Sequence, residues 1–117
     1  MDPSGREDTL KAGFPGMATE GIRREIENLD RLLEHRVRLA IIVLLTRYDE
    51  VSFSRLKELT GETDGNLGAN LRKLEEAGYI EADKGYEERR PITWYSVTSE
   101  GLEALSQHIQ ALEDLLG

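Results

Sequence analysis

Two asparagines that lie four residues apart carry side-chain amides suited to base recognition. Leu67, Leu71 and Leu74 recur at i, i+4 and i+7, which predicts a helix that buries this stripe. Asn66 and Asn70 share one face of that helix, and we expect this face to be exposed. An asparagine amide can pair bidentately with N6 and N7 of adenine. For Asn66, capping of the helix is an equal alternative.

Basic side chains near these asparagines could contact phosphate. Arg72 and Lys73 follow on the same helix, and Lys84, Arg89 and Arg90 lie in a charged segment further along. Carboxylates beside them offer two alternatives, which are a solvated charge run or surface ion pairs worth only about 0–1 kcal/mol.

The sequence offers little for catalysis or metal binding. It contains no cysteine and only two histidines, His35 and His108, so we expect no metal site. Adjacent carboxylates such as Glu75 and Glu76 cannot both face one pocket from a helix. No nucleophile stands with a base and an orienting partner. We therefore expect no catalytic residues, no enzyme activity and no cofactor.

The charge balance limits how nucleic acid could be bound. The formal net charge is -8, and half of it comes from residues 91–117, which contain four acidic and no basic side chains. Nucleic-acid-binding domains are typically basic. DNA affinity must therefore come from a local arrangement of cations and not from the overall field.

The first part of the chain predicts an arm followed by helix. Residues 1–21 show no periodicity and are expected to form a flexible N-terminal arm. From Ile22 to Leu33 apolar residues follow helical spacing, and the apolar block Leu39–Leu45 predicts a buried helix. The pattern allows either one helix that bends near His35 or two helices that meet there.

The central segment has the pattern of a helix-turn-helix at about residues 52–77. Ser52 and Thr63 can each cap a short helix, and Gly61 and Gly78 can end them. Two short helices with a tight connection make this motif. Residues of the first helix would contact the backbone at the groove edge. The predicted DNA-binding residues are Ser54, Arg55, Lys57, Asp64, Asn66, Ala69, Asn70, Arg72, Lys73, Lys84, Arg89 and Arg90.

The period then changes from helical to alternating. The segments 79–83 and 92–97 are rich in β-branched and aromatic residues, which predicts a hairpin at about 79–98 with a polar tip over Lys84–Pro91. Thr98 caps a final helix at about 99–116. Its apolar residues step by 3 and 4, the spacing of a coiled-coil seam.

Two apolar seams, one near each end of residues 22–117, predict a dimer. Each exceeds what so small a domain covers by itself, and pairing across a two-fold axis would bury both. The alternative is that the terminal helices pack on their own domain. The predicted dimerisation residues are Ile22, Ile26, Leu29, Leu102, Leu105, Ile109, Leu112 and Leu116.

Residues 33–105 resemble the winged-helix domain of MarR/ArsR-like transcriptional regulators. Four segments carry the resemblance, namely residues 34–41, 53–61, 64–80 and 94–101. It implies an α+β, mostly α, winged helix-turn-helix with a β-hairpin wing and terminal dimerisation helices. It also implies a homodimer that binds double-stranded DNA, with the recognition helix in the major groove and the wing on the backbone or minor groove. A small-molecule or protein effector stays open.

Two further expectations complete the functional prediction. Fold does not fix function, so the alternative is a winged helix that binds protein without intrinsic DNA binding, which the acidic balance favours. No apolar run approaches the roughly 20 residues of a membrane span, and cysteine is absent. We therefore expect a cytoplasmic protein with no membrane contact.

Overall fold

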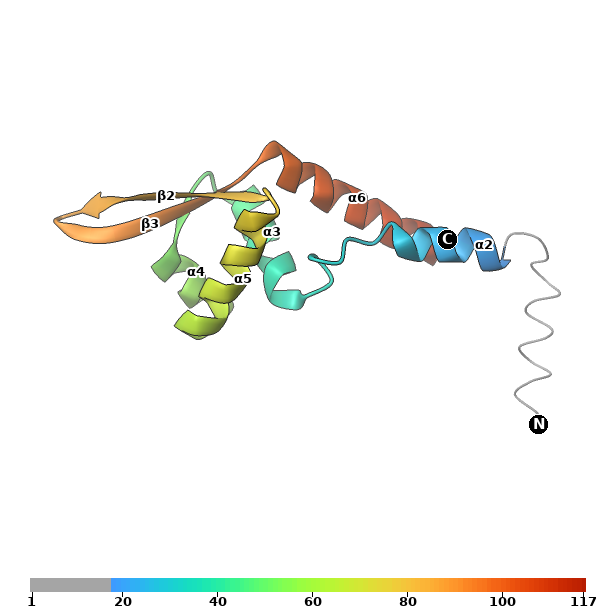
Figure 1. The fold of residues 1–117 in the computed structure, drawn as a ribbon, viewed down its shortest axis with the longest axis horizontal. Helices are drawn as coiled ribbons and strands as arrows, with labels where there is room; N and C mark the ends of the chain where they lie inside the picture. Colours follow the sequence, from blue (N-terminus) through green and yellow to red (C-terminus); the bar gives the residue numbers. More distant parts are fainter. Residues whose placement is uncertain (1–17) are drawn as a thin grey trace.

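The computed structural model describes residues 18–117, which form five helices and one antiparallel sheet of strand order β1-β3-β2. Figure 1 shows α4 and α5 beside one end of the long β2–β3 hairpin, while α2 and α6 extend together in the opposite direction. This is the winged helix that the sequence predicts. The elements are α2 (Ala18–Glu27), α3 (Arg36–Arg47), β1 (Val51–Ser52), α4 (Phe53–Thr60), α5 (Asp64–Glu76), β2 (Ile80–Glu87), β3 (Arg90–Val97) and α6 (Ser99–Leu116).

Two separate helices, not one bent helix, lead into the core. Asp30 separates them, because its Oδ1 accepts hydrogen bonds from the backbone N–H groups of Leu32 at 2.8 Å and Leu33 at 3.1 Å. Leu33 is fully buried in the core and so does not belong to the seam predicted to run from Ile22. The predicted arm was also too long, since α2 already begins at Ala18. Residues 1–17 of that arm lie outside the described residues.

The capping residues of the helix-turn-helix are those predicted. Ser52 Oγ accepts from the N–H of Arg55 at 3.2 Å, and Thr63 Oγ1 accepts from the N–H of Asn66 at 3.1 Å. Gly61 ends α4 with φ +71°, a left-handed conformation that glycine adopts without steric cost. Helices α4 and α5 bury their leucines against α3 and the sheet.

The hydrophobic core of the domain is built from several elements. Its fully buried large side chains are Leu33, Ile41, Ile42, Leu45, Leu56, Leu67, Leu71, Leu74 and Ile80.

The hairpin has a much shorter tip than the sequence predicted. Glu88 and Arg89 alone connect the strands, with φ of 50° and 68°. Lys84 and Pro91, placed in the tip by the prediction, instead lie within β2 and β3. Proline is tolerated in β3 because β1 covers only Tyr95 and Trp94, which leaves β3 an edge strand at Pro91. The two-residue strand β1 was not predicted.

Helix α6 packs on its own domain through small residues, while its leucine seam stays open. Gly101, Ala104, His108 and Ala111 are its buried residues. The predicted seam remains largely uncovered, with exposed fractions of 47% for Leu102, 46% for Ile109, 43% for Leu112 and 88% for Leu116. Leu105 is half-buried at the edge of the core. Among residues 18–117, α6 included, no helix is both long and apolar enough to cross a membrane.

Asp30 joins the terminal helices to the end of α5. The Tyr79 hydroxyl donates a hydrogen bond to Asp30 Oδ2, and the Asp30 backbone N–H donates to Nδ1 of the buried His108 at 2.9 Å. Burial, followed by the hydrogen bond to Asp30 and the charge of that carboxylate, raises the pKa of Tyr79 to about 12. The neutral hydroxyl is therefore the form that the folded state favours.

This pKa shift predicts a loss of stability in alkali. The unfolded tyrosine loses its proton near pH 10 and the folded one near pH 12, so the folded state binds more protons between these values. The contribution of Tyr79 should be complete below pH 10 and fall as the pH rises toward 12. Urea unfolding from pH 8 to 11.5 should show a shallower decline for Tyr79→Phe than for the wild type.

Two other tyrosines help to interpret the urea unfolding measurement. Burial also raises the pKa of Tyr95, so part of the decline should persist in Tyr79→Phe. The control is Tyr86→Phe, which removes a hydroxyl from a side chain that is 79% exposed. Equal alkaline slopes for Tyr79→Phe and the wild type would contradict the assignment.

Candidate nucleic-acid interface

Helix α5 buries one face and exposes another at the surface between α4 and the wing. Leu67, Leu71 and Leu74 point into the core as predicted. The exposed residues of this helix include Gly65, Asn66, Arg72 and Lys73, and Ala69 is half-buried. A helix presented in this way can enter a major groove.

Asn70 does not point outward, and its predicted exposure was wrong. Only 4% of it is exposed, because it lies about 60° around the helix from Leu67 and thus on the buried side. Its Oδ1 accepts from Nη1 of Arg38 at 2.9 Å, and its Nδ2 donates to the carbonyl oxygen of Asn66 at 2.9 Å. Both polar ends of the Asn70 amide are therefore engaged within the protein.

Asn66 keeps the exposed position that was predicted. Its Nδ2 donates to Oε2 of Glu62 at 3.0 Å, and its Oδ1 lies 3.4 Å from the donor Nδ2 of Asn70. Thr63 caps the helix, so the alternative in which the Asn66 side chain acts as the cap is wrong. An amide has two N–H bonds and two acceptor lone pairs. One donor and one acceptor direction of Asn66 thus remain for a base edge.

Three of the predicted site residues, Arg55, Lys57 and Asp64, form ion pairs on this surface. Lys57 Nζ lies 2.8 Å from Oδ1 of Asp64, a contact that links α4 to the first turn of α5. Arg55 pairs with Glu58 at 3.0 Å. By contrast, Arg72 and Lys73 form no ion pair with any other described residue, so pairing with Glu75 or Glu76 is not observed. Ser54 is exposed on α4.

A groove between α5 and the wing brings further predicted cations together. Arg72 and Lys84 both line this groove of about 560 Å³, whose lining also includes Phe53, Leu71 and Tyr95. At the wing tip, Arg89 and Arg90 are exposed and form no ion pair among residues 18–117. The wing therefore presents three basic side chains to solvent.

Three residues of this surface were missed at the sequence level. Tyr86 is 79% exposed on the wing, although strand alternation places it on the same face as the buried Ile80. Arg38 had no sequence signal, because its partner Asn70 lies 32 residues away in sequence. Glu62 did have one, because it lies four residues before Asn66, a spacing at which side chains on a helix can meet. The two glycines of α5, Gly65 and Gly68, have open space where a Cβ would stand. Close packing between helices therefore does not require a glycine at either position.

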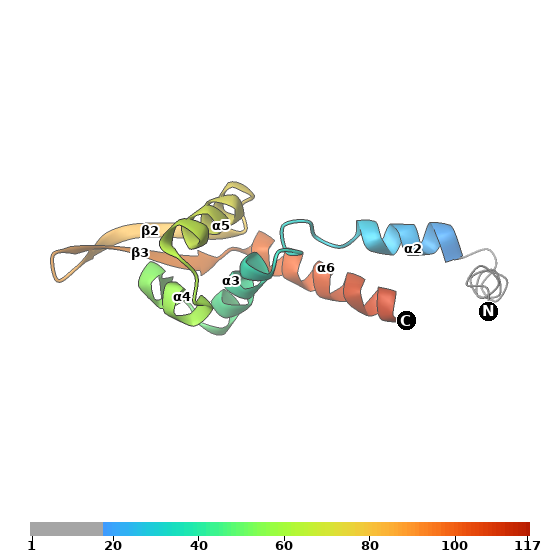
Figure 2. The same ribbon diagram turned by 90° about the horizontal axis from the view of Figure 1, so that it is seen from below.

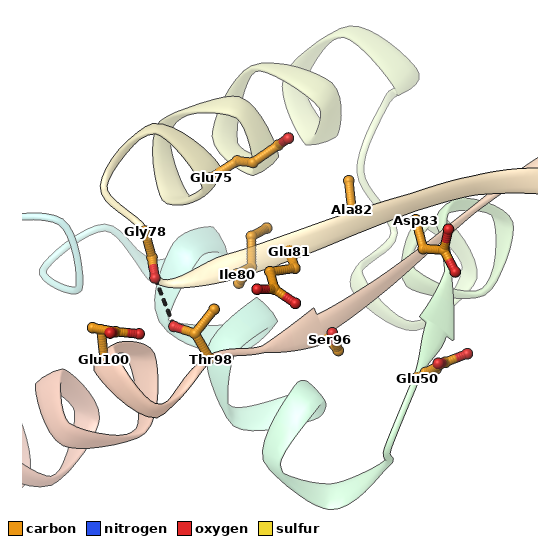
Figure 3. A pocket seen from close by; sticks show the side chains of 10 residues that line it. All are labelled: Glu50, Glu75, Gly78, Ile80, Glu81, Ala82, Asp83, Ser96, Thr98 and Glu100. Carbon is orange, nitrogen blue, oxygen red and sulfur yellow. Dashed lines mark hydrogen bonds between the residues drawn. The ribbon is translucent and has the colours of Figure 1, made fainter.

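The negative charge gathers in a hollow at the base of the wing. This open hollow has a volume of about 860 Å³. Figure 3 shows the carboxylates around it, which come from α5, β2, α6 and the segment before β1. Backbone and Thr98 hydrogen bonds at the first turn of α6 lower the pKa of Glu100, so this carboxylate is ionised at neutral pH. The acidic residues that line the hollow are Glu50, Glu75, Glu81, Asp83 and Glu100.

Comparison with known proteins identifies the fold and the family. The winged helix DNA-binding domain family matches residues 37–116. An uncharacterized protein of Methanocaldococcus jannaschii is 37% identical over 79 residues, which cover 68% of this chain and 86% of that protein.

Solved structures share the same architecture. A transcriptional regulator homologue from Pyrococcus horikoshii superposes with a TM-score of 0.73 at 26% identity, covering 84% of this chain and 95% of that one. A MarR-family transcriptional regulator from Streptomyces coelicolor, solved in complex with DNA, shares the fold with a TM-score of 0.58 at 20% identity, covering 83% and 67% of the two chains. The chain belongs to the winged helix DNA-binding domain family and has the fold of MarR-like transcriptional regulators.

Proposed function

We propose that the protein is a sequence-specific transcriptional regulator that binds double-stranded DNA as a homodimer. The observation that carries this proposal is the set of exposed cations on α5 and the wing that have no acidic partner among the described residues, notably Lys73, Arg89 and Arg90. The Streptomyces coelicolor regulator of the same fold was solved in complex with DNA, which supports the same partner here.

The placement of the residues suggests their roles. Asn66 would read base edges in the major groove, where Gly65 and Ala69 add no bulk. Lys73 and Arg72 would contact phosphate from α5, and Lys84, Arg89 and Arg90 from the wing. Tyr86 would pack on the sugar-phosphate backbone. Ser54, Arg55 and Lys57 would approach the backbone from α4, with Asp64 holding Lys57 in place.

The open apolar seam supports the dimer. Leu102, Ile109 and Leu112 of α6 and Ile22 and Ile26 of α2 are each between 43% and 52% exposed. Figure 2 shows α2 and α6 projecting together from the domain, away from the wing. A second copy of this surface would cover both helices. Such a dimer would present two recognition helices about 34–36 Å apart, one turn of B-DNA, and would favour palindromic sites.

The double variant Arg89→Ala/Arg90→Ala tests DNA binding through the wing. DNA binding through phosphates weakens steeply with salt, and loss of each phosphate-contacting cation should lower the slope of log K against log salt by about one. We expect the double variant to bind mixed duplex DNA more weakly and to lose about two units of slope. Fluorescence anisotropy at several salt concentrations measures both quantities.

The matched control changes the same charge elsewhere. Arg23 and Arg24 form an exposed arginine pair on α2, remote from the wing in Figure 1. Arg23→Ala/Arg24→Ala should leave the slope unchanged. Equal effects of the two double variants would show that only overall charge matters, and absence of binding by a folded wild type at low salt would contradict DNA binding.

A second function has one observation in its favour. The acidic hollow of Figure 3 would attract a basic protein surface and repel phosphate. A winged helix that binds protein without DNA would show no salt-sensitive duplex binding. The anisotropy experiment therefore separates the two functions.

A further inference from the structure

Four polar side chains form a continuous chain from α3 to the surface of α5. Arg38 donates to Asn70, Asn70 donates to Asn66, and Asn66 in turn donates to Glu62. The three distances are 2.9, 3.4 and 3.0 Å. Asn70 is nearly fully buried, whereas Asn66 is exposed where base contacts are expected.

The chemistry at the two ends gives this chain a direction. A guanidinium has only donors and an ionised carboxylate has only acceptors. Arg38 therefore requires the oxygen of Asn70 to face it, which turns the Asn70 NH₂ toward Asn66. Glu62 requires the NH₂ of Asn66 to face it, which turns the Asn66 oxygen toward Asn70. Both ends thus select the same orientation of the Asn66 amide.

Arg38 is itself held in place. Its Nε donates to the carbonyl oxygen of Leu32 at 2.8 Å, and its stem is half-buried on α3. One guanidinium therefore ties the segment between α2 and α3 to the buried face of α5. Lysine could not make both contacts, because it lacks the planar array of donors.

We propose that Arg38, Asn70 and Glu62 are positioning residues that hold the Asn66 amide in one orientation, so that Asn66 reads adenine on one strand only. Adenine offers the N7 acceptor and the N6 donor in a fixed order, and A·T and T·A pairs differ in the major groove. An amide with one fixed orientation matches one of these pairs, whereas a freely flipping amide matches both. The inference rests on the proposed DNA-binding function.

The test begins by finding the base pair that Asn66 reads. The full chain selects binding sequences from duplexes with a randomised centre, and each A·T pair of the selected sequence is then exchanged for T·A. The wild type should discriminate by roughly 10-fold or more at the pair that Asn66 reads. Asn66→Ala should abolish discrimination at that pair alone and thereby identify it.

Asn70→Asp then cuts the chain without changing its shape. The carboxylate still accepts from Arg38 but cannot donate to Asn66, so the Asn66 amide is free to flip. We expect discrimination at the identified pair to fall to about 2-fold or less, with other pairs and the salt slope unchanged. The added negative charge should weaken binding to all duplexes alike and cancel in the ratio.

A second variant and a second measurement address folding. Glu62→Gln changes a residue outside the core and lets either end of the Asn66 amide face this side chain. Asn70 alone then selects the orientation, so discrimination should fall part of the way. Asn28→Asp makes the same chemical change as Asn70→Asp at an exposed site and should have no effect. In the DNA-free protein, NMR of the Asn66 NH₂ group should show faster hydrogen exchange in Asn70→Asp and Glu62→Gln.

The possible outcomes distinguish failure of the positioning role from failure of the proposed DNA-binding function. If Asn66→Ala loses discrimination while Asn70→Asp and Glu62→Gln retain it, the positioning role is overturned. Unchanged NH₂ exchange in both variants also overturns it. Salt-dependent binding by the wild type without any selected sequence overturns base reading by Asn66, and absence of salt-dependent binding overturns the proposed function itself.

Discussion

Ile109→Glu is expected to convert the proposed homodimer into a monomer and to weaken binding to a palindromic duplex by about 100-fold or more. Ile109 lies at the centre of the open seam of α6 and is 46% exposed in the single chain. A carboxylate there would be buried without a partner if two copies paired through this seam. The large loss of DNA affinity follows because a monomer cannot engage two half-sites at once.

Light scattering after size exclusion gives the oligomeric state, and anisotropy gives the affinity. Gln110→Glu adds the same charge one residue further along, about 100° around the helix, and should leave the dimer intact. Because Ile109 is not part of the buried core, Ile109→Glu should keep its helical circular dichroism. A wild type that is monomeric at micromolar concentration, or a variant that remains dimeric, would contradict the proposed interface.

Gly101→Ala is expected to destabilise the fold by about 2 kcal/mol or more, although alanine favours helices. Gly101 lies in the first turn of α6, and a Cβ there would overlap the Tyr79 carbonyl oxygen and come within 2.8 Å of Val97 Cγ2. The carbonyl cannot move freely, since it accepts from the N–H of Thr98 at 3.0 Å. Thr98 Oγ1 also donates to the carbonyl oxygen of Gly78 at 2.6 Å, the contact drawn in Figure 3.

Gly68→Ala supplies a control with the opposite sign. Gly68 is also helical, but a Cβ there meets nothing within 4 Å. The Gly68→Ala substitution should stabilise the protein by up to about 1 kcal/mol, the difference in helix propensity between glycine and alanine. Urea unfolding followed by circular dichroism measures both variants. Equal stability of Gly101→Ala and the wild type would show that α6 can move away from the turn at Tyr79.

Local signals in the sequence determined the helices of the winged domain and their caps. Ser52, Thr63 and Thr98 each accept a hydrogen bond from the backbone three residues ahead, a contact set by neighbouring residues alone. The leucine stripe of α5 likewise follows from its spacing. The separation of α2 from α3 was left open, because the side chain of Asp30 that caps the intervening turn gives no periodic signal.

Tertiary structure decided which side chains face inward where two stripes compete. In α6 a stripe of small residues, with His108 among them, runs one position before the leucine stripe at the same 3 and 4 spacing. Only the close approach to Tyr79 shows that the small residues face the domain. The predicted leucine seam is therefore left exposed for a partner.

The placement of Asn70 has the same origin. Its spacing fits both the buried and the exposed face of α5, and hydrophobicity favours the exposed one. Burial of its amide is stable because Arg38, 32 residues away in sequence, satisfies the oxygen. The sequence determined that an amide stands at this position, whereas only the packing of α3 against α5 decided that it supports Asn66 instead of meeting DNA. Contacts within one helix turn can be inferred from spacing, but a buried polar group depends on a partner that only the fold brings near.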